Sequence, residues 1–371
     1  MLTLIVALIV FSVLILIHEA GHLVVAKRIG VDVEAFSLGF GKRLFGIKIG
    51  GTDYRVSLLP FGGYVKMAGE DPSEASGLEG ELSSKPIGHR FWVVAAGAIT
   101  NYIFAFILFS IIFMIGVPTL SNKVGQVLQG YPAEEVGMEV GDEILSVNGR
   151  TIRYWEDIVD AIKNESKGED ALNIEIMRGE KTIDFRVQPK ISTVTNIFGQ
   201  TISRPMVGIA PQNEILSVKY NPLRAIYLGG KRLLVLTGLT YKGLWLLLTG
   251  GMPVSTSVSG PIGIANLMGQ AARLGFVPLL IITAHVSMAL AVFNLLPFPV
   301  LDGGHILFLS MEKLRGRPLS IKIQEIITQG ALILLILFAL FVSWQDVLKF
   351  TPLGKKIGNN RVQDVAQEPE K

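Results

Sequence analysis

The chain has 371 residues, of which half are hydrophobic and only 18% are charged, and its formal net charge is +3. A soluble domain usually carries about 25% charged residues, so the composition favours a membrane protein that carries a soluble insert. The small net charge argues against a nucleic-acid-binding protein, and the absence of cysteine excludes disulfides, cysteine nucleophiles and cysteine-ligated metals.

Four segments are long and apolar enough to be membrane-spanning helices, which need about 20 mostly apolar residues. They cover about residues 4–26, 91–117, 276–301 and 326–348. The first lacks the basic start and the cleavage site of a secretory signal, which predicts a retained helix. Residues 222–249 are rich in leucine but interrupted by lysine and arginine. We expect this fifth segment to lie flat at the membrane interface, with insertion as the alternative.

Basic residues predict the orientation of the spans. Lys27 and Arg28 follow the first span, and lysine and arginine crowd the loop between the third and fourth spans. The positive-inside rule places both loops in the cytoplasm, and residues 118–274 on the far side. Lysines after the fourth span oppose this assignment.

Residues 36–67 contain short alternating runs punctuated by glycine, which predicts β-hairpins. A sheet edge at membrane depth must be buried in protein or line a wet cavity. We therefore expect this β region to border an active-site cavity and to offer an edge to an unwound substrate.

The soluble insert has a readable order of elements. Residues 130–133 open a helix, residues 140–149 form a short strand that ends in an Asn-Gly turn, and residues 155–163 form an amphipathic helix. Alternating residues over 172–176 and 183–187 predict two further strands. This order resembles a bacterial PDZ domain, which captures an extended peptide at a sheet edge. A β-rich spacer is the alternative.

The strongest chemical motif is His18-Glu19-Ala20-Gly21-His22 in the first span. Histidines four residues apart share one helix face, where both imidazoles can reach one Zn²⁺ and Glu19 can act as general base on a zinc-activated water. Ionisable residues inside a hydrophobic helix are costly and usually functional. The alternative is a pair of interfacial histidines near a helix end.

A catalytic zinc needs a third protein ligand and one open position. Asp302 follows two prolines that break the third span, at a depth that matches the histidines. His305 is the alternative ligand, or it contacts a ligand. If Asp302 does not bind metal, we expect it to cap a helix at the interface. His285 lies too deep to be a ligand. Asn294 can stabilise an oxyanion, hold the substrate backbone or bond to another helix. For Asn101 in the second span we favour interhelical bonding.

The histidine motif, the PDZ-like order and Asn294-x-x-Pro-x-Pro-x-Leu-Asp302-Gly together resemble the site-2 protease family of intramembrane zinc metalloproteases, in particular its bacterial RseP-type members. The resemblance extends from residue 1 to about residue 348. It implies zinc binding by His18, His22 and Asp302, a general base at Glu19, and substrate contacts at Asn294, Gly39, Phe40 and Gly41.

The resemblance also implies substrates and a location. The expected substrates are single-span membrane proteins such as anti-sigma factors already cut by another protease, whose peptide or ectodomain meets the PDZ domain. The expected location is the bacterial inner membrane, with the PDZ-like domain outside and the active site near the cytoplasmic side. Two departures stand out: the family's Gly-Pro before Asn101 is Gly97-Ala98 here, and the insert has room for one PDZ domain.

We therefore predict a polytopic α-helical membrane protein with four transmembrane helices, a membrane-associated β region and one PDZ-like domain. A non-catalytic PDZ scaffold and a metal transporter are the competing hypotheses. The intact Glu19 argues against the first and the lack of an internal repeat against the second. The expected segments are 1–117 with the first two spans and the zinc motif, 118–192 as the PDZ-like domain, 193–274 as a linker with the interfacial helix, 275–350 with the last two spans, and 351–371 as a polar tail.

Overall fold

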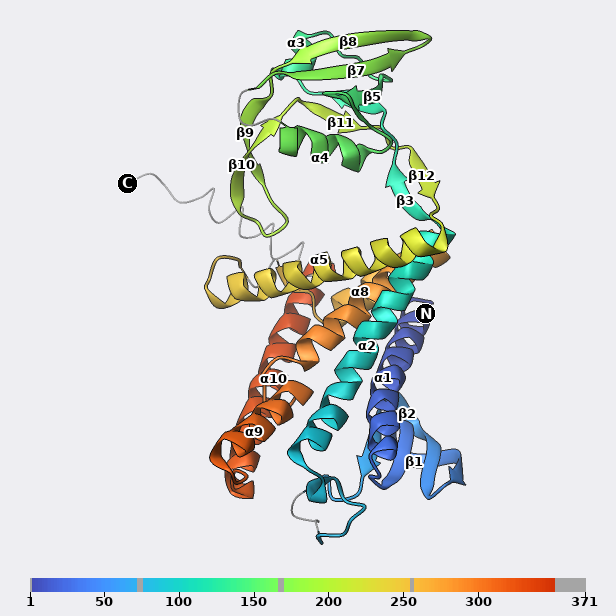
Figure 1. The fold of residues 1–371 in the computed structure, drawn as a ribbon, viewed down its shortest axis with the longest axis vertical. Helices are drawn as coiled ribbons and strands as arrows, with labels where there is room; N and C mark the ends of the chain where they lie inside the picture. Colours follow the sequence, from blue (N-terminus) through green and yellow to red (C-terminus); the bar gives the residue numbers. More distant parts are fainter. Residues whose placement is uncertain (1, 72–75, 166–169, 254–256, 351–371) are drawn as a thin grey trace, which may run out of the picture. The chain divides into compact units, whose positions relative to one another are not determined.

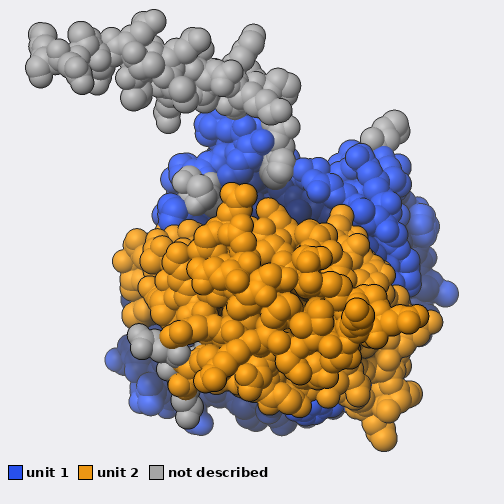
Figure 2. Space-filling model, turned by 90° about the horizontal axis from the view of Figure 1, so that it is seen from above, with its two compact units in different colours: residues 1–112, 225–244, 253–371 blue, residues 113–224, 245–252 orange. Residues whose placement is uncertain are grey.

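The structure is a computed structural model that describes residues 2–71, 76–165, 170–253 and 257–350, without the side chains of residues 60, 61 and 350. The polar tail expected at 351–371 lies outside the described residues. The chain forms two compact units, which Figure 2 colours separately. The first unit comprises residues 1–112, 225–244 and 253–371, and the second unit comprises residues 113–224 and 245–252.

Among the described residues, four helices are long and apolar enough to cross a membrane, in agreement with the predicted number of spans. They are α1 (Leu2–Arg28), α2 (Ile87–Ile115), α8 (Phe276–Asn294) and α10 (Ile321–Phe350) (Figure 1). The third span was expected to reach residue 301, but α8 ends at Asn294. Pro297 and Pro299 explain the early end, because proline lacks the helical N–H and clashes with the preceding turn. The chain resumes as α9 (Asp302–Arg315).

Small residues bring the first helices together. A Cβ atom at Gly21 of α1 would lie 2.5 Å from the carbonyl oxygen of Ala96 on α2. Such contacts let membrane helices approach closely when apolar burial gives no driving force. A further helix, α7 (Pro261–Leu274), packs against α1, α8 and α10 and buries Met268 completely. No helix was expected over residues 261–274 from the sequence.

Helix α5 (Pro222–Leu248) covers the fifth apolar segment. It begins after Asn221, whose side chain accepts a hydrogen bond from the Arg224 N–H. It is not among the four candidate spans of the described chain. Its expected interfacial position remains a prediction.

The predicted β region between the first two spans is confirmed as one antiparallel pair of long strands. These are β1 (Val33–Ile49) and β2 (Thr52–Met67), and they contact α1 (Figure 1). Leu38 of β1 is paired with both Gly63 and Val56, so each half of β2 lies beside the same part of β1. The half from 63 to 67 lies next to α1, because Val65 and Met67 share a buried core with Leu23.

The second unit has its own hydrophobic core, with Ile144, Ile158 and Leu172 among its fully buried residues. The predicted strands and helix of the insert are confirmed there. Asn148 and Gly149 take left-handed φ angles of 49° and 77°, as a two-residue hairpin turn requires. The core is built on a four-stranded sheet in the order β6 (Arg150–Thr151), β5 (Glu143–Val147), β7 (Leu172–Arg178), β8 (Lys181–Val187), with helices α3 (Pro132–Glu135) and α4 (Trp155–Glu165).

The second unit continues beyond residue 192, where we expected a linker to begin. Val207 is 2% exposed within the same core. The additional strands are β9 (Lys190–Thr195) paired with β10 (Thr201–Met206), β11 (Ile209–Pro211) paired with β4 (Val124–Val127), and β12 (Ile215–Val218) paired with β3 (Val117–Leu120).

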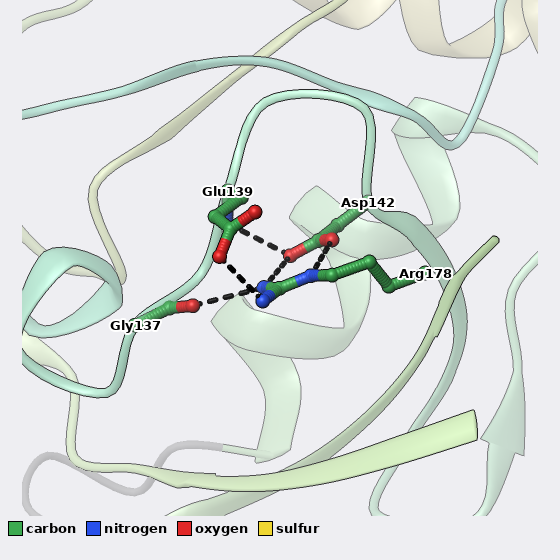
Figure 3. A network of polar contacts seen from close by, with 4 residues as sticks. All are labelled: Gly137, Glu139, Asp142 and Arg178. Carbon is green, nitrogen blue, oxygen red and sulfur yellow. Dashed lines mark hydrogen bonds and ion pairs between the residues drawn. The ribbon is translucent and has the colours of Figure 1, made fainter. Parts of the chain in front are cut away.

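A network of charged groups around the buried Asp142 closes the loop before β5 (Figure 3). Arg178 donates from Nε and Nη2 to the two oxygens of Asp142, at 2.7 and 2.8 Å, and also bonds to Glu139 and to the carbonyl oxygen of Gly137. Burial alone would raise the pKa of Asp142. The hydrogen-bonded Arg178 guanidinium and the Glu139 backbone N–H outweigh burial, so the pKa of Asp142 lies below its usual value.

Candidate metal centre

Two imidazoles and one carboxylate converge inside the first unit. His18 Nε2 lies 3.3 Å and His22 Nε2 lies 3.7 Å from Asp302 Oδ2, and the two Nε2 atoms lie 3.2 Å apart. The three side chains are 13%, 9% and 18% exposed. His18 and Asp302 are 284 positions apart in the sequence. Together with His22 they nevertheless bring three ligand atoms close together.

The spacing of these atoms fits a zinc ion. Zinc is bound by nitrogen and oxygen at about 2.0–2.2 Å in tetrahedral geometry, which places neighbouring ligand atoms about 3.3–3.6 Å apart. The three observed distances lie close to that range. Within the described chain, the buried Asp302 Oδ2 has no hydrogen-bond partner, as expected for an oxygen that serves a metal.

Helix α2 orients the histidine pair. His22 Nδ1 lies 2.7 Å from the backbone oxygen of Val93. A carbonyl oxygen only accepts, so Nδ1 carries the proton and Nε2 keeps its lone pair for a metal. One turn further along α2, a Cβ atom at Gly97 would lie 2.6 Å from His18 Cε1 and would overlap His22 Nε2. The bare backbone of α2 therefore forms one wall of the site.

Asp302 reaches the histidines because the chain turns sharply after α8. The turn covers residues 295–301, and Asp302 is the first residue of α9. Gly303 packs directly on the turn, where a Cβ atom would lie 2.5 Å from the carbonyl of Leu295. This compact turn holds the start of α9 beside the end of α8.

The β region positions Glu19. The backbone N–H of Val65 donates to Glu19 Oε2 at 3.1 Å. Gly63 lies next to the same side chain, because a Cβ atom there would be 3.8 Å from Glu19 Cγ. The carboxylate is thus held between α1 and residues 63–67 of β2.

These groups line one cavity of about 590 Å³. Its wall includes His18, Glu19, His22 and Asp302. Residues from β2, α2, α9, the start of α10 and the segments that connect these elements also line it. The cavity adjoins the β region between the first two spans, which was expected to border an active site. Its β2 residues are Tyr64, Val65 and Met67.

The other predicted site residues differ in whether they line the cavity. His305 lines the cavity but is not part of the three-residue cluster. Asn294 is the last residue of α8, is half-buried and is not among the residues that line the cavity. Phe40 is separated from the cavity by one side chain, since its ring stacks on Tyr64 with centroids 5.8 Å apart. The flanking Gly39 and Gly41 have φ angles of 87° and 85°.

His285 and Asn101, which were also considered from the sequence, make contacts between or within helices. His285 Nδ1 lies 2.7 Å from the Ile281 carbonyl oxygen, and its ring meets Phe109 edge to face. Asn101 is buried, and its backbone oxygen accepts a hydrogen bond from Ser287 of α8. Interhelical bonding was expected at Asn101, and the bond observed there, to α8, is made by its backbone oxygen.

Sequence reasoning missed several residues of the site. Arg90 and Glu312 line the cavity and are paired with each other, and Val93 and Gly97 contact the histidines. Arg90, directly before an apolar segment, was a usable signal, because charges at membrane depth are costly. A valine carbonyl and a bare glycine carry no such signal.

Known proteins resemble this chain over most of its length or over part of it. The sequence pattern of Peptidase family M50 matches residues 6–338. The protein Cj1068 of Campylobacter jejuni is 34% identical over 91% of both chains. The regulator of sigma-W protease RasP of Bacillus subtilis is 30% identical over 93% of this chain and 98% of its own. The solved PDZ domain of an SdrC-like protein from Listeria innocua matches 25% of this chain and 96% of its own, with 21% identity and a TM-score of 0.21.

Proposed function

Because the chain belongs to Peptidase family M50 and is a zinc metalloprotease, we propose that it hydrolyses peptide bonds in the transmembrane segments of single-span membrane proteins. The observation that carries this proposal is the position of the ligand cluster. His18 and His22 lie within α1, which is apolar enough to cross a membrane and ends with the basic residues Lys27 and Arg28. A site at that depth acts on peptide within or at the edge of the bilayer.

His18, His22 and Asp302 would hold the zinc ion. Three protein ligands leave one open position, as catalytic zinc sites require. When bound, zinc polarises a carbonyl and lowers the pKa of a water from 15.7 to about 7. His22 is held in the ligating tautomer by its hydrogen bond to Val93.

Glu19 is the general base in this proposal. Its Oε2 is anchored by the Val65 N–H, so we assign proton transfer to Oε1. Oε1 takes a proton from the attacking water and delivers it to the nitrogen of the leaving amine. General acid–base catalysis of this kind contributes about 10²–10⁴-fold in rate.

An extended substrate would lie along residues 63–67 of β2. These residues border both the cavity and Glu19, and a peptide added to a sheet edge satisfies backbone groups that lipid cannot. Asn294 would contact the substrate backbone from the end of α8. The Gly39-Phe40-Gly41 segment of β1 would support the edge through the contact of Phe40 with Tyr64.

The substrate class follows from the relatives and from the second unit. RasP is named as a regulator of sigma-W, so we propose substrates that control sigma factors, such as anti-sigma factors already cut by another protease. The second unit would be an extracytoplasmic PDZ-like domain that binds a peptide or ectodomain of the substrate. Positively charged loops support an active site near the cytoplasmic side of the inner membrane.

The test is cleavage of a membrane-anchored substrate. Wild type and Glu19→Gln are co-expressed with tagged single-span proteins, and truncated products are detected by blotting. We expect products only with the wild type, whereas purified Glu19→Gln retains zinc. Glu79→Gln is the matched control, because Glu79 is exposed and lies outside the residues that line the cavity. Cleavage by Glu19→Gln at the wild-type rate would remove Glu19 from the mechanism.

A further inference from the structure

A second pair of charged side chains meets in the wall of the same cavity. Arg90, in the first turn of α2, donates from Nη1 to Glu312 Oε2 of α9 at 3.0 Å and from Nη2 to Oε1. Its Nε also donates to the Lys85 carbonyl oxygen at 3.1 Å. The two side chains are 19% and 15% exposed. A bidentate arginine–carboxylate pair constrains direction as well as distance, and removing one partner leaves the other charge uncompensated.

Helix α9 has few other polar attachments. In the described part of the chain, the side-chain hydrogen bonds and ion pairs that join α9 to other elements are those of Asp302 and Glu312. Leu301, at the N-terminal cap, provides no capping side chain. The start of α9 rests on the turn that precedes it, since Gly304 packs against Pro299. Glu312 is therefore the polar contact that ties the rest of α9 to a second helix.

The partner of Glu312 lies on the face of α2 that holds the histidines. Arg90, Val93 and Gly97 follow one another at intervals of three and four residues, so they share one side of the helix. Val93 accepts from His22, and Gly97 packs on both imidazoles. The same face of α2 thus contacts the histidine pair at one level and the helix of Asp302 at another.

We propose that Arg90 and Glu312 are positioning residues that hold Asp302 in register with His18 and His22 and thereby set the affinity for zinc. This inference rests on the proposed ligand set. Glu312 lies ten residues after Asp302, about 15 Å along the helix. Tying α9 to α2 at that point limits the tilt of α9 and so limits the movement of Asp302 away from the histidines.

The test measures zinc binding by the purified full-length protein in detergent. Zinc affinity is determined by competition with a chromophoric chelator, and stoichiometry by elemental analysis. We expect Glu312→Gln and Arg90→Gln to weaken zinc binding by about 10–100-fold, the range typical of residues that orient metal ligands. Lys313→Gln, which alters the exposed neighbour of Glu312, should bind zinc like the wild type.

A charge exchange separates positioning from general stability. The double variant Arg90→Glu with Glu312→Arg should recover zinc affinity to within about fivefold of the wild type, because the pair is restored with reversed polarity. The melting temperature of each zinc-free variant is measured in parallel. If the exchange restores the melting temperature but not the zinc affinity, the pair is only structural and the proposal is wrong.

Asp302→Ala distinguishes failure of this inference from failure of the ligand set. If Asp302→Ala loses zinc while Glu312→Gln and Arg90→Gln bind it like the wild type, the positioning role is excluded and the ligand set stands. If Asp302→Ala itself binds zinc like the wild type, the ligand set is wrong.

Discussion

Gly97 of α2 lies so close to His22 that a Cβ atom at residue 97 would overlap the Nε2 atom of the imidazole. Residue 97 therefore lies against the nitrogen that faces Asp302. Any side chain here must displace one histidine or separate α1 from α2.

Replacement of Gly97 by alanine should abolish zinc binding, or weaken it by at least about 10-fold, because an orienting contact is replaced by an overlap. Gly88→Ala is the matched control, since Gly88 lies in the same helix and a Cβ atom there would meet nothing within 4 Å. Zinc stoichiometry of the two purified variants provides the measurement. Equal zinc content in both would show that α1 and α2 can separate without cost to the site.

The choice between Asp302 and His305 as third ligand is testable. Asp302 Oδ2 lies within 3.7 Å of both Nε2 atoms, whereas His305 is not part of the cluster. We expect Asp302→Ala to lose zinc and His305→Ala to retain it at one ion per chain. Elemental analysis after dialysis against a weak chelator measures both. Retention by Asp302→Ala and loss by His305→Ala would exchange their roles.

Asp346 should contribute strongly to stability at the far end of α10. It is fully buried, and its Oδ2 accepts the backbone N–H of Gly263, in the first turn of α7, at 2.7 Å. First-turn N–H groups have no partner within their own helix. Asp346→Ala would leave this donor unsatisfied, and we expect the free energy of unfolding to fall by about 2–3 kcal/mol.

Unfolding of Asp346→Ala in detergent is compared with that of Gln345→Ala, which alters the preceding residue of the same helix. Asp346→Asn, which keeps an acceptor oxygen, should lose less than the alanine variant. Equal stability of Asp346→Ala and Gln345→Ala would show that the contact contributes little.

The network of Asp142 and Arg178 predicts acid sensitivity of the second unit (Figure 3). The pKa of Asp142 is lowered in the folded chain, so this carboxylate stabilises the fold above the pKa of the unfolded chain, about 3.9. That stabilisation is lost as the pH falls below about 4 and through the folded-state pKa. Amide hydrogen exchange of residues 137–142, corrected for intrinsic rates, should accelerate over this range.

Asp142→Asn should show fast exchange of the same residues already at neutral pH, with little further change on acidification. Arg178→Gln should behave similarly, because the carboxylate loses its hydrogen-bonded partner. A wild-type chain that kept full protection down to pH 3 would show that the ion pair does not hold this loop.

Local patterns in the sequence predicted much of the structure. The apolar runs identified α1, α2 and α10, and two prolines marked the break before Asp302. The alternating residues of the insert identified β5, β7 and β8, and Asn148-Gly149 identified the turn. Short strands such as β11 and β12 were not predicted, because three or four residues carry too little periodicity. These strands exist because distant strands pair with them.

The sequence by itself determined that His18 and His22 share a helix face with Glu19 beside them, since the helix period alone places residues four apart together. Only the tertiary structure decided that Asp302 Oδ2 completes a zinc-sized triangle with them. It also decided that Val93 and Gly97 form the wall behind the imidazoles, and that Arg90 meets Glu312. These contacts join residues about 70 to 280 positions apart, and they follow from how closely the helices and the turn after α8 pack, which local residue patterns do not encode.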